Sequence, residues 1–132
     1  MKMIILSILT SLLFSCSEPQ QDLARVKQLT PKEFKAQKMN SKSVLLDVRT
    51  PEEFAGGYLE GAENADFRGG EFEKKMQGWD KDKVYYLYCA SGNRSGKAAE
   101  LMREAGFEHI YNIGGYSTLK EAGLPTEGES NR

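Results

Sequence analysis

Short apolar runs rich in β-branched and aromatic residues alternate with amphipathic segments along most of this chain. Residues 44–48, 83–89 and 109–113 have the composition and length of buried strands. Helix-start signals stand before and after the first of them, since residues 30–33 and 50–53 each combine a capping threonine, a proline and a glutamate. Because strands that alternate with helices pair in parallel, the pattern predicts an α/β fold with helices on both faces of a sheet.

The segment after residue 89 has the clearest helical periodicity. From Arg94 onward, the apolar residues fall on one helical face, and Gly106 supplies a stop; the face consists of Ala98, Leu101, Met102 and Ala105. A parallel sheet covered by helices places its ligand site at the carboxyl ends of the strands. The residues that follow the first two predicted strands are therefore the first candidates for chemistry.

The composition is that of an ordinary globular domain. A chain of 132 residues, 39% hydrophobic and 28% charged, can bury one core but is too short for two full domains. We expect one monomeric domain over residues 25–128 and a polar tail over residues 129–132. A formal charge of −1 argues against nucleic-acid binding, which requires an excess of basic residues. The single histidine, His109, and the Gly-Gly pairs lack metal- or nucleotide-binding context, so no metal or cofactor is expected.

Residues 1–15 have the layout of an export signal, in which Lys2 precedes an apolar run. This run is too short to span a bilayer, which takes about 20 residues. Residues 13–16, Leu-Phe-Ser-Cys, resemble the lipobox of bacterial lipoproteins, which implies that Cys16 is lipidated and that a polar linker follows it to residue 24. Cleavage that leaves Cys16 as a free thiol stays open as the alternative. We expect the domain to be held at a bacterial membrane, on the periplasmic side.

Cys89 ends a predicted strand, and a short polar loop separates it from the next helix. Glycine and asparagine in such a loop can adopt left-handed backbone angles that turn N–H groups towards an anion, and the helix start adds partial positive charge. Both effects favour a thiolate, and Arg94 can pair with a negatively charged substrate. We predict nucleophilic chemistry at Cys89, with a substrate loop of Ala90, Ser91, Gly92, Asn93 and Ser95. A buried structural cysteine is the alternative.

Three segments resemble the rhodanese (sulfurtransferase) family, in the same order and across nearly all of residues 25–126. They are Asp-Val-Arg-Thr-Pro-Glu-Glu-Phe at residues 47–54, the loop at residues 89–95, and a closing segment with Gly-Gly at residues 114–115 and Ala-Gly-Leu-Pro at residues 122–125. The resemblance implies a three-layer α/β fold around a five-stranded, mainly parallel sheet. It also implies that Cys89 takes a sulfane sulfur from a small anion such as thiosulfate, as a persulfide, and passes it to cyanide or a thiol. A thiol-reducing protein is a further candidate partner, because no glutathione pool exists outside the cytoplasm.

Two positions depart from the family pattern. Tyr58 stands where a histidine is usual, which is expected to change the rim of the pocket, and Leu119 replaces a tryptophan, which concerns packing. Asp47 and Arg49 lie at the end of a predicted strand, where a charged pair orders neighbouring loops more often than it takes part in catalysis. We therefore assign these two residues a supporting role.

Two other functions remain open. Cysteine-based phosphatases and arsenate reductases have five residues between cysteine and arginine, whereas four separate Cys89 from Arg94, which makes a smaller cradle. The second alternative is a membrane-tethered rhodanese-like module that binds a partner or carries sulfur with little turnover. Measurable turnover separates this module from the enzyme.

Overall fold

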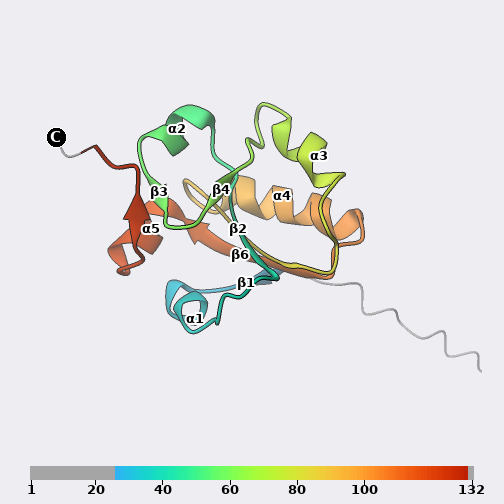
Figure 1. Cartoon of the computed structure of the whole chain (residues 1–132), viewed down its shortest axis with the longest axis horizontal. Coiled ribbons are helices and arrows are strands. Elements are labelled where there is room, and N and C mark those ends of the chain that lie inside the picture. Colours follow the sequence, from blue (N-terminus) through green and yellow to red (C-terminus); the bar gives the residue numbers. More distant parts are fainter. Residues whose placement is uncertain (1–25, 131–132) are drawn as a thin grey trace, which may run out of the picture.

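The structure, a computed structural model, describes residues 26–130 (Figure 1). The predicted signal peptide, the lipidation site Cys16 and the linker to residue 24 lie outside this range. The elements follow one another as β1 (Lys27–Gln28), α1 (Pro31–Lys35), β2 (Ser43–Asp47), α2 (Pro51–Ala55), β3 (Tyr58–Leu59), β4 (Glu63–Asn64), α3 (Glu71–Met76), β5 (Val84–Cys89), α4 (Asn93–Glu104), β6 (His109–Gly115), α5 (Tyr116–Glu121) and β7 (Thr126–Glu127). None of the helices in this range is long and apolar enough to cross a bilayer.

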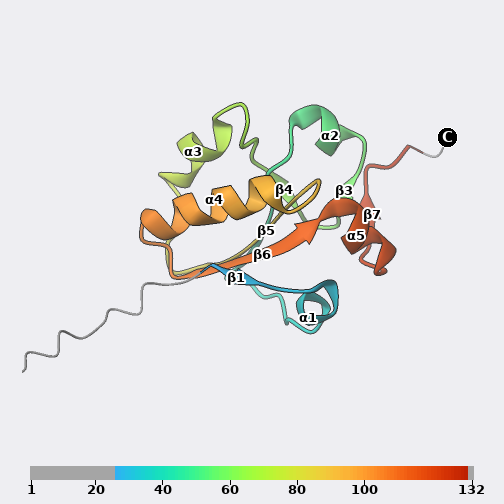
Figure 2. The ribbon, with the colours of Figure 1, turned by 180° about the vertical axis from the view of Figure 1, so that it is seen from behind.

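Five strands form the central sheet in the order β1-β6-β5-β2-β4, and every neighbouring pair is parallel. The helices α3 and α4 lie on one face of this sheet, and α1 and α5 lie on the other (Figures 1 and 2). The predicted three-layer α/β fold is therefore confirmed. The strands β3 and β7 form a separate antiparallel pair beside it.

Both predicted helix starts are present, at α1 and α2. Thr30 and Thr50 cap the two helices, and each accepts a hydrogen bond from the backbone N–H of the glutamate three residues later. The glutamate side chains, Glu33 and Glu53, accept in return from the backbone N–H of their threonines, at 2.9 and 3.2 Å. These reciprocal bonds satisfy donors that the first turn of a helix leaves free. Two helices of only five residues each are thereby fixed at their amino ends.

Each face of the sheet carries its own hydrophobic cluster. On the α4 side, Ala98 and Met102 are fully buried against β2 and β5, as the periodicity predicted. On the α1 side, Phe34 and Leu119 are buried in the second cluster, so Leu119 has the packing role expected of it. His109, at the start of β6, is exposed. The two clusters hold β5, and therefore Cys89 at its carboxyl end, in the middle of the molecule.

The pairing of β5 with β6 contains one irregularity close to the carboxyl ends of both strands. Leu87 pairs with Asn112, but the next residue of β5, Tyr88, pairs with Gly114. The extra residue on β6 is Ile113, which is the signature of a β-bulge. Bulges redirect side chains, and this one lies two residues before Cys89.

The chain end beyond β7 contacts the domain at Glu129, a residue that the sequence assigned to the polar tail. Its carboxylate accepts hydrogen bonds from the Tyr116 hydroxyl at 2.8 Å and from the Lys120 ammonium at 2.5 Å. Tyr116 also lies over the Arg49 guanidinium, which is 4.2 Å from the ring centroid. Glu129 therefore adds a contact next to the candidate site.

We predict that Phe72→Ala destabilises the domain by about 3–5 kcal/mol, because the Phe72 side chain of α3 is fully buried and its removal leaves a cavity. The ring of Trp79, the single tryptophan, packs edge-on at 5.4 Å from that of Phe72. Urea unfolding followed by tryptophan fluorescence therefore measures the effect. Met39→Ala is the control, since Met39 is 45% exposed and its loss should change stability by about 0.5 kcal/mol or less. Equal effects of the two substitutions would contradict the assigned core.

Candidate active site

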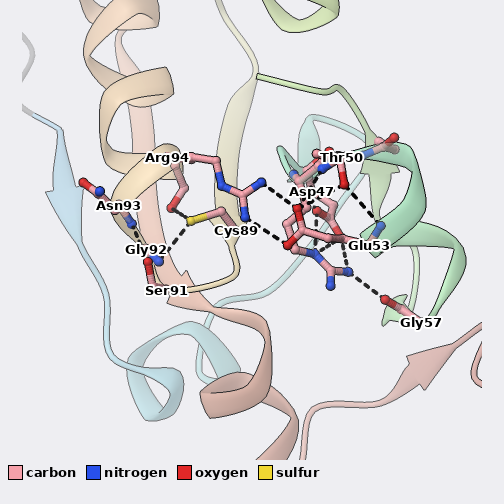
Figure 3. A network of polar contacts seen from close by, with 12 residues as sticks. Asp47, Thr50, Glu53, Gly57, Cys89, Ser91, Gly92, Asn93 and Arg94 are labelled. Carbon is pink, nitrogen blue, oxygen red and sulfur yellow. Dashed lines mark hydrogen bonds and ion pairs between the residues drawn. The ribbon is translucent and has the colours of Figure 1, made fainter. Parts of the chain in front are cut away.

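Cys89 is the last residue of β5, and α4 begins at Asn93, so three residues make the turn between them (Figure 3). Gly92 has φ +92°, in the left-handed region, and a Cβ there would lie 3.2 Å from the Cα of Gly114. A Cβ on Gly115 would lie 2.6 Å from the carbonyl oxygen of Ala90. The absence of side chains at Gly114 and Gly115 of β6 therefore allows the loop to pack closely against this strand. Asn93, which the sequence also allowed to be left-handed, is instead helical.

The Cys89 sulfur accepts hydrogen bonds from inside the loop. The Gly92 N–H donates to Sγ at 3.0 Å, and the Ser95 hydroxyl lies 3.4 Å from the same atom. Burial by itself raises the pKa of the thiol, but the Ser95 hydroxyl and the N–H groups of Ser95, Ser91 and Gly92 lower it, and the net direction is down. The loop therefore favours the thiolate, because several donors converge on one sulfur atom.

Asn112 is a residue of this site that the sequence reasoning missed. Its Nδ2 donates to the carbonyl oxygen of Gly92 at 2.9 Å, and its Oδ1 accepts from the Ser95 hydroxyl at 2.8 Å. The Gly114 N–H donates to the same Oδ1 at 3.1 Å. The one signal in the sequence is an amide among apolar neighbours in a predicted buried strand. Asn112 ties the loop to β6.

Arg94 pairs with a carboxylate of the protein itself. Its two terminal nitrogens donate to the two oxygens of Glu53, at 2.7 and 3.0 Å, and the pair lies beside the Cys89 sulfur in Figure 3. The Arg94 bond is the main reason that the pKa of Glu53 falls from 4.5 to about 2. Glu53 therefore has two roles, because it caps α2 and holds Arg94. The sequence identified the first role and missed the second, and it had assigned the Arg94 fork to a substrate anion.

Asp47 and Arg49 form a buried ion pair at the end of β2, with a shortest N–O distance of 2.7 Å. Arg49 also donates to the carbonyl oxygen of Gly57 at 2.6 Å, and its guanidinium lies under the Tyr116 ring. These bonds join the end of β2 to the turn after α2 and to α5. The pair therefore orders the segments around the site.

The remaining predicted residues surround the loop at different depths. Cys89 and Ser95 are fully buried, whereas Ala90, Ser91 and Asn93 are exposed. Tyr58, which replaces the family's usual histidine, stacks on Phe54 of α2 with the ring centroids 4.0 Å apart. It therefore packs against the capped helix that presents Glu53. Within residues 26–130, no three His, Cys, Asp or Glu side chains are grouped so as to hold a metal ion.

Comparison of the sequence with known proteins finds relatives that include two bacterial proteins. The chain is 40% identical over 90 residues to the uncharacterised protein YqhL of Bacillus subtilis (strain 168), which covers 68% of both chains. It is 32% identical over 80 residues to the thiosulfate sulfurtransferase PspE of Escherichia coli (strain K12), which covers 61% of this chain and 74% of PspE.

Solved structures and family profiles agree with these relatives. The crystal structure of a rhodanese-like domain protein from Staphylococcus aureus superposes with a TM-score of 0.65 at 29% identity, covering 80% of this chain and all of that one. The profile described as "Rhodanese-like domain" matches residues 30–122, which include Glu53, Cys89, Arg94 and Asn112. The chain therefore belongs to the rhodanese-like domain family.

Proposed function

We propose that this protein is a sulfurtransferase that moves a sulfane sulfur from a small anionic donor, such as thiosulfate, to cyanide or a thiol. The observation that carries the proposal is the Cys89 sulfur at the carboxyl end of β5, with the Gly92 N–H aimed at it from 3.0 Å. Relatives described as thiosulfate sulfurtransferases, PspE among them, support it. Cys89 is the proposed nucleophile, and Ala90, Ser91, Gly92 and Asn93 form the loop that meets the substrate.

The proposed reaction has two steps and needs no cofactor or external oxidant. In the first step, the Cys89 thiolate attacks the outer sulfur of thiosulfate, the new S–S bond forms, and sulfite leaves with the electron pair of the broken S–S bond. In the second step, cyanide or a thiolate attacks the outer sulfur of the persulfide. The Cys89 thiolate then leaves, and it is ready for the next donor. Charge is conserved in both steps, because an anion enters and an anion leaves.

The resting structure hides the nucleophile, because Cys89 is fully buried and Arg94 is already paired. We therefore assign Arg94 a second state, in which the donor anion replaces Glu53 on its guanidinium. The planar guanidinium can bind either partner with two parallel hydrogen bonds. Separation of Arg94 from Glu53 also frees the edge of the loop next to Sγ. Binding of the donor and exposure of the Cys89 sulfur then occur together.

One observation also favours the alternative, a rhodanese-like module that carries sulfur or binds a partner with little turnover. A fully buried cysteine is usually unreactive, and the Glu53–Arg94 pair would have to stay closed in such a module. Steady turnover with thiosulfate decides between the two functions. Phosphatase chemistry is disfavoured, because the loop is one residue shorter than in cysteine phosphatases.

We further propose that Cys16 carries a lipid that anchors the domain to a bacterial membrane, on the periplasmic side. The Leu-Phe-Ser-Cys stretch at residues 13–16 and the polar residues after it support this proposal. Several acyl chains on one cysteine make anchoring effectively permanent, at about 0.8 kcal/mol per buried methylene. A thiol-reducing protein is the proposed partner that regenerates Cys89 when it becomes oxidised, and the domain is proposed to act as a monomer.

Incubation of the full chain with thiosulfate should add one sulfur atom to the Cys89 peptide, detected by mass spectrometry. Cys89→Ser should abolish both this gain and thiocyanate formation from cyanide, because serine cannot form a persulfide. Arg94→Ala should lower kcat/KM by about 10²-fold, as for the loss of one preorganised charge. Arg94→Lys should recover little of it. Thiocyanate production by Cys89→Ser, or aryl phosphate hydrolysis that matches sulfur transfer in rate, would overturn the proposal.

Glu53→Gln should increase the rate at which iodoacetamide alkylates Cys89, because a neutral amide holds Arg94 less tightly. The Glu53→Gln substitution should also change how the free energy of unfolding depends on pH. The lowered pKa of Glu53, about 2, means that its ionised form stabilises the fold above pH 4.5 and that this contribution is lost as the pH falls towards 2. Urea unfolding at several pH values should therefore show wild type losing its advantage over Glu53→Gln across that interval.

Glu33→Gln is the matched control, since Glu33 has the same place in the α1 capping box and has no arginine among its hydrogen-bond partners. It should leave the alkylation rate of Cys89 unchanged. If both substitutions have the same effect on alkylation, the Glu53–Arg94 pair does not control access to the sulfur.

Cells that express the full chain should retain the protein in the membrane fraction, and Cys16→Ser should release it or leave it unprocessed. The mass of the purified amino-terminal peptide reports the lipid directly. Recovery of wild type from the soluble periplasm, with an unmodified Cys16, contradicts the proposed anchor.

A further inference from the structure

The Ser95 hydroxyl lies between two acceptors and has one proton to give. Cys89 Sγ is 3.4 Å away on one side, and Asn112 Oδ1 is 2.8 Å away on the other. All three residues are buried, so water does not compete for the bond. A buried hydroxyl of this kind must choose one acceptor at a time.

The orientation of the Asn112 amide is fixed by its other partners. The Gly114 N–H requires an acceptor at 3.1 Å, and the Gly92 carbonyl requires a donor at 2.9 Å. Only one assignment of oxygen and nitrogen satisfies both, and it presents Oδ1 to Ser95. Towards Ser95, Asn112 is therefore purely an acceptor.

We infer that Ser95 and Asn112 form a hydrogen-bond switch, in which the Ser95 hydroxyl donates to Asn112 while the Cys89 sulfur is neutral and to the sulfur when it is a thiolate. In the neutral state the hydroxyl oxygen can accept the S–H proton. In the thiolate state Asn112 loses the Ser95 proton but keeps the Gly114 N–H, so neither state leaves Oδ1 unpaired. Ser95 and Asn112 are thus positioning residues that act through the sulfur's protonation state.

The hydrogen-bond switch affects the rates of the two steps of the proposed reaction differently. In the persulfide, the negative charge sits on the outer sulfur, and the Cys89 Sγ is a neutral sulfide that accepts hydrogen bonds weakly. When the acceptor attacks, Sγ leaves as a thiolate and regains the Ser95 proton. A leaving thiolate that is better stabilised departs faster, whereas an attacking thiolate becomes somewhat less nucleophilic. Ser95 should therefore accelerate the acceptor step and not the donor step at equal thiolate content.

The charged groups around the Cys89 sulfur do not interfere with a measurement of the thiol pKa. Arg94 on α4 pairs with Glu53 on α2, whose pKa is about 2, and Asp47 and Arg49 at the end of β2 pair with each other. Tyr116 on α5 has its pKa raised to about 12, mainly by burial. Between about pH 5 and 10, a titration of reactivity thus reports Cys89.

The first test is the rate of Cys89 alkylation by iodoacetamide against pH, followed in the full chain by the mass of the Cys89 peptide. Ser95→Ala should raise the thiol pKa by about one unit, since it removes one hydrogen bond to a charged group. Asn112→Ala removes the competitor for this proton but also the bond to the Gly92 carbonyl, so it is compared in wild type and in the Ser95→Ala background, and relative to its parent the thiol pKa should be lower in wild type. Ser117→Ala, an exposed serine of α5, is the matched control and should leave the pKa unchanged. An unchanged pKa in Ser95→Ala, or an effect of Asn112→Ala that is the same in both backgrounds, overturns the switch.

The second test separates the two half-reactions, and it alone depends on the proposed sulfurtransferase function. At a pH where Cys89 is fully ionised, Ser95→Ala should slow persulfide cleavage by cyanide about 10-fold and leave the rate of sulfite release from thiosulfate unchanged or faster. Ser95→Thr, which keeps the hydroxyl, should restore cleavage. Equal slowing of both half-reactions would show that Ser95 only supports the loop. If wild type forms no persulfide, the proposed function fails, and the alkylation profiles still decide the switch.

Discussion

The left-handed turn at Gly92 is the constraint on which the rest of the site depends. It reverses the chain between β5 and α4 within three residues, and its left-handed φ and close approach to Gly114 both disfavour a side chain at this position. Because the turn is this tight, the Gly92 N–H reaches the Cys89 sulfur, and α4 starts one residue later with its amino end beside the same atom. A wider turn would aim these donors elsewhere. The acidity of the thiol therefore depends on the backbone path as well as on the Ser95 hydroxyl.

Side chains from distant parts of the chain keep that path in place. Asn112 reaches the Gly92 carbonyl from β6, next to the bulge that interrupts the pairing of β5 with β6. Glu53 reaches Arg94 from α2, and the same carboxylate caps that helix, so the position of Arg94 depends on an intact α2. The Asp47–Arg49 ion pair fixes the segment that connects β2 to α2, because Arg49 also donates to the Gly57 carbonyl after α2. The sheet brings these groups together because the carboxyl ends of parallel strands meet at one edge.

The site combines two properties that oppose one another, a fully buried sulfur and a lowered thiol pKa. Burial alone disfavours the thiolate, so the hydrogen bonds from the loop must outweigh it. These bonds are directed at Sγ, which in the proposed reaction is in turn an attacking thiolate, the neutral inner sulfur of the persulfide and a leaving thiolate. The Glu53–Arg94 pair adds an internal anion at the place where a donor anion is expected to bind. A closed resting state protects the thiol from oxidation, which matters for a protein proposed to work outside the cytoplasm.

The sequence by itself determined the features that depend on residues close together in the chain. Both capping boxes, the apolar face of α4, the three central strands and the position of Cys89 at a strand end follow from patterns spanning a few residues. Only the tertiary structure decided which partners meet. Glu53 and Arg94 are 41 residues apart, Ser95 and Asn112 are 17 apart, and no local pattern links either pair. The two-residue strands β1, β3, β4 and β7 were likewise invisible, because so short a strand exists only through its neighbour in the sheet.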